Sequence, residues 1–257
     1  MAEGEEMPEI ESKASLFGRI ERGQWSQEFR YLRSREWLGQ LEGKRVLDLG
    51  CGRGLYLKYL RELKAEVIGV DVVAEALRIA RQYAGEASLG LCLGSGSSLP
   101  FLDQSFDAVL SIEVLSHVPH AHQEEVVKEI GRVLRPGGRA IVSVHNPARF
   151  ALQNLIRLQR PQAFYPNPGL TIYPIAQSRL MSGFSRCGFA VVDEVVFSNL
   201  YNSIHHKYPA ISPLLRRMED GVSHVPLLRR MCLTMLVRFE KCALSTGAEK
   251  ETAECAA

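Results

Sequence analysis

The chain has 257 residues, of which 46% are hydrophobic and 23% are charged. This composition is typical of a globular protein that buries a sizeable core, either in one large α/β domain or in two small ones. The formal net charge of +2 argues against a nucleic-acid binder that relies on bulk electrostatics.

The two ends of the chain are polar. Residues 1–13 contain five glutamates, and the first seven are acidic where a signal peptide would be basic and then apolar. Residues 245–257 are small and polar, so both ends are predicted to be flexible and to flank one domain at 14–244.

No apolar run approaches the roughly 18 residues of a membrane-spanning helix. Six widely spaced cysteines without a Cys-x-x-Cys pair indicate a reduced, cytoplasmic compartment.

Short runs rich in Val, Ile and Leu alternate with segments of helical period, a pattern typical of a parallel α/β sheet. Helices are expected over 74–83 and 174–186, after the first strand, and before Pro136-Gly137-Gly138, which is expected to end a helix. The strands are expected, in chain order, at 45–50, 66–71, 89–93, 106–112, 139–145, 188–198 and 231–240.

These elements predict one fold class: a doubly wound, Rossmann-like α/β domain with a seven-stranded, mostly parallel sheet. Two irregular segments, 146–172 and 199–230, follow the fifth and sixth strands. They are expected to be insertions that cover the carboxyl edge of the sheet, where ligand sites of such folds lie.

The strongest motif is Val46-Leu-Asp-Leu-Gly-Cys-Gly-Arg-Gly54, in which alternate glycines follow a buried strand. Such a turn lets the backbone approach a ligand closely, and the following helix points its positive end into it. A nicotinamide fingerprint would have a third glycine where Leu55 stands. Asp48, at the strand end, would repel a pyrophosphate and suits an ammonium or a sulfonium.

Two further elements follow at fixed positions. Asp71 ends the second strand, and a carboxylate there can accept both hydroxyls of an unphosphorylated ribose. The loop Gly94-Ser-Gly-Ser-Ser-Leu-Pro-Phe101 follows the third strand and is placed to border a purine ring. Each element alone is a weak signal, but their order and spacing together are specific.

With these motifs in register, the chain resembles the class I S-adenosylmethionine-dependent methyltransferases. Within them it is similar to the branch that includes the ubiquinone and menaquinone biosynthesis methyltransferases. The resemblance runs from about Trp37 to Ala140 and includes Leu99-Pro-Phe101, Ser105-Phe-Asp-Ala-Val109 and Arg132-Val-Leu-Arg-Pro-Gly-Gly138. It implies S-adenosylmethionine as the cofactor.

The resemblance also implies roles for individual residues. Asp48, Gly50 and Gly52 would hold the methionyl part, Asp71 the ribose, Val72 one adenine face, and Ser95 with Gly96 the adenine edge. Relatives usually have an aspartate at the position of Ser95, whose hydroxyl is a weaker acceptor. The predicted cofactor-binding set also includes two residues beside these motifs, Cys51 in the glycine loop and Ser111 on the fourth strand. For Cys51, a small residue that fits the loop is favoured over a nucleophile.

Methyl transfer from a sulfonium is an SN2 displacement, which needs in-line positioning, exclusion of water and, for a neutral acceptor, a base. The candidate catalytic residues at strand ends are Glu113 and His145. The resemblance adds His117 as a third candidate, because relatives often have a histidine at its position near the pocket. For His145, a strand-end histidine bonded to the backbone is an equally good interpretation. A metal site at His117, His120 and His122 is not expected, because Pro119 interrupts the cluster and no carboxylate pairs with it.

The acceptor is predicted to be a small molecule. The fourth strand lacks the Asn/Asp-Pro-Pro-aromatic signature of enzymes that methylate DNA bases, and there is no Pro-Cys pair for attack on cytosine. Segment 201–241 has seven basic and three acidic residues and contains Pro-Leu-Leu-Arg-Arg-Met twice. Its arginines fit a solvated helix face, a lid over an apolar or anionic acceptor, or a peripheral membrane contact.

Two other functions remain open at this stage. A catalytically silent adenosylmethionine-binding protein would keep the glycine loop and Asp71 but lack an acceptor site. A nicotinamide-dependent oxidoreductase would share the fold, although Leu55 and Asp48 argue against it.

Overall fold

A computed structural model describes residues 25–84, 90–147, 150, 171–197 and 234–242. The predicted flexible ends 1–13 and 245–257 lie outside these residues, as does most of both predicted insertions. The described helices are α2 (Trp25–Leu38), α3 (Leu55–Glu62), α4 (Ala74–Ala84), α5 (Gln123–Val133) and α7 (Gln177–Arg186), with a 3-10 turn η2 (Leu115–His117). The strands are β1 (Arg45–Leu49), β2 (Glu66–Asp71), β3 (Gly90–Leu93), β4 (Phe106–Ile112), β5 (Leu134–His145), β6 (Phe189–Phe197) and β7 (Thr234–Lys241).

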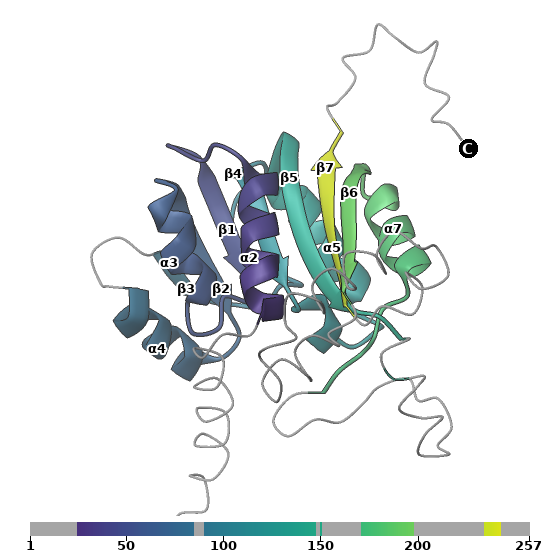
Figure 1. Cartoon of the computed structure of the whole chain (residues 1–257), viewed down its shortest axis with the longest axis horizontal. Helices are drawn as coiled ribbons and strands as arrows, with labels where there is room; N and C mark the ends of the chain where they lie inside the picture. Colours follow the sequence, from purple (N-terminus) through teal and green to yellow (C-terminus); the bar gives the residue numbers. More distant parts are fainter. Residues whose placement is uncertain (1–24, 85–89, 148–149, 151–170, 198–233, 243–257) are drawn as a thin grey trace, which may run out of the picture.

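The seven strands form one sheet in the order β3-β2-β1-β4-β5-β7-β6 (Figure 1). Strands β1 to β5 are parallel to their neighbours, and β7 runs antiparallel between β5 and β6. This arrangement confirms the prediction of a doubly wound, mostly parallel sheet of seven strands. The strand order reverses between β1 and β4, so the carboxyl ends of these two strands mark the crevice where ligands of such sheets bind.

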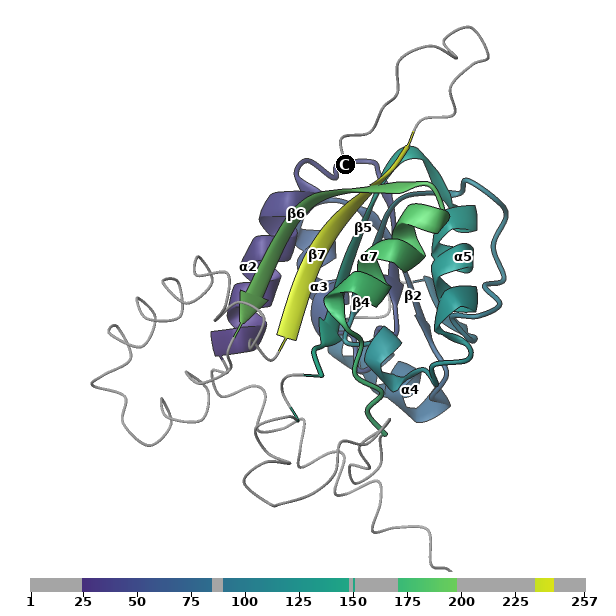
Figure 2. The same cartoon turned by 90° about the vertical axis from the view of Figure 1, so that its right-hand side faces the viewer.

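Helices cover both faces of the sheet (Figure 2), with α2 and α3 on one side and α5 and α7 on the other. Successive side chains of β1 point to opposite faces of the sheet. Val46 belongs to the apolar cluster that contains Leu57 of α3, and Leu47 belongs to the cluster that contains Ile130 of α5. The strand β1 therefore has buried apolar side chains on both faces, as expected for the centre of a covered parallel sheet. Among the described helices, none is long and apolar enough to cross a membrane.

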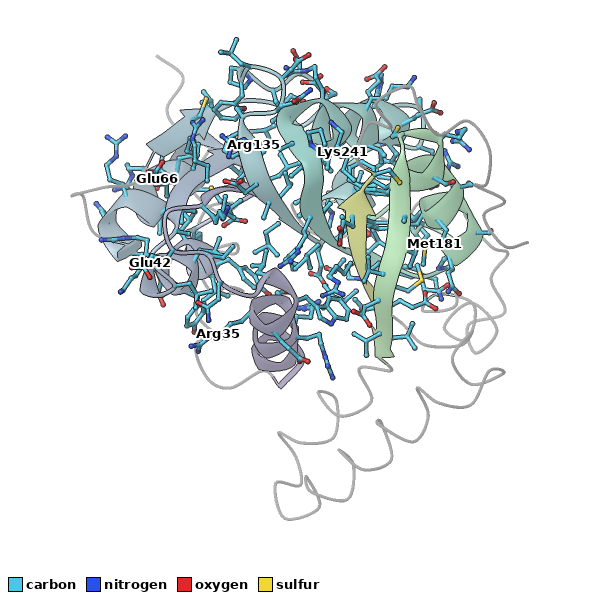
Figure 3. All side chains as sticks on the ribbon, turned by 90° about the horizontal axis from the view of Figure 1, so that it is seen from above. Arg35, Glu42, Glu66, Arg135, Met181 and Lys241 are labelled. Atoms are coloured by element: carbon cyan, nitrogen blue, oxygen red, sulfur yellow. The ribbon has the colours of Figure 1, made fainter. Side chains whose placement is uncertain are left out.

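The opposite edge of the sheet holds the amino ends of the parallel strands. Figure 3 looks onto this edge, where Glu66, Arg135 and Lys241 lie near the ends of β2, β5 and β7. Lys241 Nζ donates to the carbonyls of Gly131 and Leu134, both at 2.7 Å, and so closes the end of α5. Arg238, on the same strand, pairs with Asp193 at 2.8 Å. These two cations of segment 201–241 thus have partners inside the domain.

Helix α2 was not expected from the sequence. Among the side chains of α2 that the structure describes, the buried ones are Arg30, Ser34, Trp37 and Leu38, which share one face at helical spacing. Arg30 and Ser34 are polar, which weakens the hydrophobic periodicity that marks a helix.

The boundary between α5 and β5 differs from the expectation. The helix ends at Val133, and Pro136-Gly137-Gly138 lies inside β5, where we expected it to end a helix. The pairing of β4 with β5 shifts register between Phe106 and Ala108, and Gly137 has a φ of +74°. The Pro-Gly-Gly segment is therefore an irregularity at the start of a longer strand, which runs from Leu134 instead of Arg139.

Helix α7 begins at Gln177, three residues later than expected. The residues before it are held in place by the chain around η2. Tyr173 N donates to the carbonyl of Ser116 at 2.7 Å, and Ile175 N donates to the carbonyl of His145 at 2.8 Å. The segment 146–172 thus leaves from the end of β5, and its last residues return to the same place.

Candidate functional site

The glycine loop lies between the carboxyl end of β1 and the start of α3. Gly50, Gly52 and Gly54 have φ values of +69°, +53° and +85°, a region that favours glycine. A Cβ on Gly50 would overlap a methyl group of Val114, whereas a Cβ on Gly52 would have nothing within 4 Å in the described residues. Gly50 therefore serves close packing, and Gly52 faces open space beside the loop.

The backbone N–H groups of the loop are bound within the protein. Those of Gly50 and Cys51 donate to the carbonyl of Val70 at 2.7 and 3.0 Å. Gly52 N donates to Asp71 Oδ2 at 2.8 Å. A pyrophosphate site would offer these donors to its ligand, so the geometry does not favour the nicotinamide alternative.

Asp71 joins three segments at the carboxyl ends of β1, β2 and β3. Besides the Gly52 contact, its Oδ1 accepts from Val73 N at 2.9 Å, and its carbonyl accepts from Gly94 N at 3.0 Å. The adjacent Val72 side chain is 67% exposed. The structure therefore places Asp71 and Val72 between the glycine loop and the loop that begins at Gly94.

The second loop carries the predicted adenine-edge residues. Ser95 is exposed, and its hydroxyl lies 2.9 Å from that of Ser97. Gly96 packs over Leu49 and Val126, since a Cβ there would lie 3.4 Å from each side chain. Backbone contact between Gly94 and Asp71 brings this loop to the predicted cofactor site.

Arg132 of α5 fixes the continuation of this loop. Its guanidinium donates to the carbonyls of Leu99 and Phe101 and pairs with Glu129 and Asp103. Glu129 in turn accepts from Leu99 N at 2.7 Å. These charge-assisted bonds link the loop to helix α5 through the Arg132 side chain.

We therefore expect Arg132→Met to destabilise the domain by roughly 1–3 kcal/mol, because two carbonyls and Glu129 lose their partner. Arg78→Met is the matched control, since Arg78 pairs with Glu75 on the exposed surface of α4. Urea unfolding of both variants measures the difference. Equal midpoints for Arg132→Met and Arg78→Met would contradict this role.

Cys51 points away from the open side of the glycine loop. Its sulfur lies where a Cβ on Gly69 of β2 would contact it at 2.8 Å, within the apolar layer under α3. Burial raises the pKa of the thiol, and the Asp48 and Asp71 carboxylates raise it further. Cys51 is therefore not activated as a nucleophile, and it contributes to the glycine loop through its backbone.

Asp48 is buried at the end of β1, with 2% of its surface exposed. Its Oδ2 atom has no hydrogen-bond partner in the described part of the chain. Burial, together with the nearby Asp71 carboxylate, raises the pKa of Asp48 to about 8. A buried carboxylate with an unused oxygen suits a cationic ligand, which would supply the missing partner.

A cluster of polar side chains lies on the same face of the sheet as Asp48. Arg30 of α2 is 5% exposed and pairs with Glu113, which directly follows β4. Burial alone would lower the pKa of Arg30, but the Glu113 carboxylate reverses this effect and the pKa is raised. Burial also raises the pKa of the Tyr56 hydroxyl, whose charged neighbours are Arg30, Glu113 and Asp48.

Arg30 and the Tyr56 hydroxyl are close neighbours in this cluster. In the described residues, Arg30 Nε and the Tyr56 hydroxyl make no hydrogen bond of standard geometry. Neither residue was among those predicted from the sequence. Arg30 lies on the unexpected helix α2, and Tyr56 lies on α3, the helix expected after the first strand. A polar residue inside the buried face of a helix carries no signal in hydrophobic periodicity.

The three predicted catalytic residues come together beside this cluster. His145 Nε2 lies 3.9 Å from Glu113 Oε1, and the rings of His145 and His117 are 6.3 Å apart. His117 Nδ1 donates to the carbonyl of Thr171 at 2.9 Å. His117 therefore anchors the returning segment, whereas His145 faces the Glu113 carboxylate.

Ser111 lies apart from the other predicted residues. It is fully buried, and its hydroxyl has no partner in the described residues. Its neighbour in β4, Leu110, points to the α3 face, so the Ser111 side chain lies on the α5 face, opposite to Asp48.

The described part of the chain contains no group of three or more His, Cys, Asp or Glu residues that could hold a metal ion.

The amino-acid sequence is similar to those of known proteins. Residues 47–142 match the family model described as a methyltransferase domain. The chain is 37% identical over 109 residues to the ubiquinone biosynthesis O-methyltransferase of Idiomarina loihiensis, covering 41% of this chain and 44% of that protein. It is 38% identical over 112 residues to the protein of the same name from Alkalilimnicola ehrlichii, covering 42% and 44%. The matched region thus spans less than half the length of these relatives.

Solved structures resemble the fold over a greater length. An S-adenosylmethionine-dependent methyltransferase from Mesorhizobium loti has a TM-score of 0.59 at 19% identity, covering 80% of this chain and 95% of that one. A SAM-dependent methyltransferase from Methanosarcina mazei has a TM-score of 0.58 at 19% identity, covering 81% and 96%. At this identity the likeness concerns the fold alone.

Proposed function

Since residues 47–142 form a class I S-adenosylmethionine-dependent methyltransferase domain, we propose that the protein transfers the methyl group of this cofactor to a small-molecule acceptor. The observation that carries the proposal is the junction of Gly52 and Asp71. A glycine that faces open space donates to a carboxylate at the end of the next strand. This junction provides room for a nucleoside-linked ligand and a carboxylate for its ribose.

The residues present fit the cofactor at its charged end as well. The unused Asp48 Oδ2 suits the cofactor's ammonium, and the buried guanidinium of Arg30 suits its carboxylate. Asp71 would accept from the ribose hydroxyls, and Val72 with Ser95 and Gly96 would border the adenine. When bound, the cofactor supplies an electrophilic methyl group on a sulfonium.

The protein's part in such a reaction is to hold the acceptor in line, exclude water and take up a proton. Glu113, His117 and His145 lie together at the ends of β4 and β5 and in η2, beside the crevice where the strand order reverses. Two relatives are named O-methyltransferases, which supports a hydroxyl oxygen as the acceptor atom. A hydroxyl must lose a proton on methylation, so a base is required.

The predicted lid remains part of this proposal. Its first half, 146–172, starts after β5, and the residues at its end contact η2 and β5 beside His117 and His145. This anchoring supports a cover over the acceptor site. The second half, 199–230, and the paired arginines of the repeated motif lie outside the described residues. The peripheral membrane contact therefore stays a prediction from the sequence.

Calorimetry with S-adenosylhomocysteine and with NADH separates methyl transfer from the nicotinamide alternative. We expect S-adenosylhomocysteine to bind and NADH not to bind, because the N–H groups of Gly50, Cys51 and Gly52 are already used. Binding of NADH alone would refute the cofactor assignment. Binding without turnover would instead support the silent alternative.

Asp71→Ala is expected to weaken S-adenosylhomocysteine binding by about 10- to 100-fold, since hydrogen bonds to a charged group contribute about 1.5–3 kcal/mol. Glu75→Ala serves as the control, because it removes an exposed carboxylate from the first turn of α4. If calorimetry gives both folded variants the affinity of the wild type, Asp71 does not bind the ribose.

A further inference from the structure

Glu113 has a backbone conformation that is rare for a residue with a side chain. It directly follows β4 and has a φ of +63°. Its N–H donates to both the carbonyl and the hydroxyl of Ser143 in β5, at 3.0 and 2.9 Å. Such a conformation is unfavourable for a residue with a side chain and persists where the surroundings fix it. Here it turns the carboxylate toward α2 and the end of β5.

The carboxylate of Glu113 lies between two buried groups. Its Oε1 atom pairs with Arg30 Nη1 and lies 3.9 Å from His145 Nε2. The side chains of Arg30 and His145 are both 6% exposed, whereas that of Glu113 is 30% exposed. One oxygen therefore connects the cation of α2 with the imidazole of β5, at the edge of the buried region.

In the described part of the chain, side chains from several elements surround this carboxylate. Arg30 faces it from α2, Tyr56 from α3 and His145 from β5, and Asp48 of β1 is a further charged neighbour of Tyr56. His117 of η2 lies against the His145 ring. Arg30 is the positive charge in this set, and it pairs directly with the Glu113 carboxylate.

Of the two histidines, His145 is the one whose ring nitrogen faces a carboxylate. His117 uses Nδ1 for the carbonyl of Thr171. Both backbone polar groups of His145 are hydrogen-bonded. Its N–H donates to Ser116 Oγ at 2.7 Å, and its carbonyl accepts from Ile175 N. The histidine is thus held by the main chain, and its ring position depends on its side-chain neighbours.

We propose that Glu113 is a positioning residue that orients His145 as the proton acceptor for the methylated hydroxyl, with Arg30 holding Glu113 in place. This inference rests on the proposed function and assigns distinct roles within the site. A separation of 3.9 Å is longer than a hydrogen bond, and a shift of about 1 Å converts it into one. The ionised carboxylate then stabilises the imidazolium that forms during the reaction.

The step is balanced in atoms and charge. The acceptor oxygen forms a bond to the methyl carbon while the bond from that carbon to sulfur breaks, and both electrons of the broken bond remain on sulfur. The hydroxyl proton moves to the imidazole of His145. The products are a methyl ether, a neutral thioether and an imidazolium whose charge faces Glu113.

The test combines three variants, Glu113→Gln, His145→Asn and the double variant, with Glu124→Gln as the control. Glu124 is an exposed carboxylate on α5 that pairs with Lys128. Initial rates are measured across pH with labelled S-adenosylmethionine and the methyl-accepting fraction of an organic-solvent cell extract. Calorimetry with S-adenosylhomocysteine measures the cofactor site separately.

We expect Glu113→Gln to lower the rate about 10- to 100-fold and to shift the acidic limb of the pH profile to lower pH, while its cofactor affinity stays within about threefold of the wild type. The double variant should be no slower than His145→Asn, because Glu113 acts through His145. Multiplicative losses, a wild-type rate in Glu113→Gln, or an equal loss of cofactor binding would each overturn the inference. Absence of methyl transfer by the wild type would instead contradict the proposed function.

Discussion

Replacing Asp48 by asparagine is expected to stabilise the cofactor-free protein at pH 9 and to weaken S-adenosylhomocysteine binding at the same time. Burial and the Asp71 carboxylate raise the pKa of Asp48 to about 8, whereas the pKa of an aspartate in an unfolded chain is about 3.9. Between these values the folded protein keeps a proton that the unfolded protein has lost. The free energy of unfolding therefore falls as the pH rises toward 8.

Asparagine cannot ionise, so Asp48→Asn removes this penalty. We expect its melting temperature to exceed that of the wild type by several degrees at pH 9 and by less at pH 5. Thermal unfolding at the two pH values measures the effect. A difference that is the same at both would show that the Asp48 charge is not buried as described.

Cofactor binding should respond in the opposite sense. The ammonium of the ligand pairs with the ionised form of Asp48, so the affinity of the wild type should rise between pH 6 and pH 8. The Asp48→Asn variant should lose about 10- to 100-fold in affinity at pH 8, since it loses a charge-assisted bond. An unchanged dissociation constant for this variant would remove Asp48 from the cofactor site.

Gly52→Val is expected to abolish S-adenosylhomocysteine binding while the fold is retained. A side chain on Gly52 meets no atom of the described residues within 4 Å, so it extends into the space proposed for the cofactor. Its positive φ adds a strain of roughly 1–3 kcal/mol. Circular dichroism reports the fold, and calorimetry reports the binding.

Gly43→Val is the matched control for this strain. Gly43 has a φ of +68°, and a Cβ added to it would also meet no atom of the described residues within 4 Å, but it precedes β1 at the opposite edge of the sheet. Both variants should lose similar stability, and Gly52→Val alone should lose binding. Binding retained by a folded Gly52→Val protein would refute the loop assignment.

Gly50 differs from Gly52 in a way that the sequence does not reveal. Both are alternate glycines of one motif, yet a Cβ on Gly50 would overlap Val114, whereas Gly52 is unobstructed by the described residues. The motif predicts a tight turn because its glycines adopt positive φ. Which glycine faces open space depends on how Val114, after the end of β4, packs on the loop, and this is a tertiary contact.

The strands and the positions of Asp48 and Asp71 could be predicted, because buried parallel strands are continuous apolar runs with a polar residue at the end. Helix α2 could not, because Arg30 and Ser34 occupy its buried face. Its contribution to the site, the ion pair between Arg30 and Glu113, joins residues 83 positions apart. Local patterns do not report pairs of this kind.

The most direct test of methyl transfer is mass spectrometry of a cell extract incubated with the protein and S-adenosylmethionine labelled in its methyl group, with Gly52→Val as the inactive control. We predict a labelled small molecule that appears with the wild type and is absent with Gly52→Val. Label found only in nucleic acid, or no labelled product from a wild-type protein that binds S-adenosylhomocysteine, would contradict the assignment of a small-molecule methyltransferase.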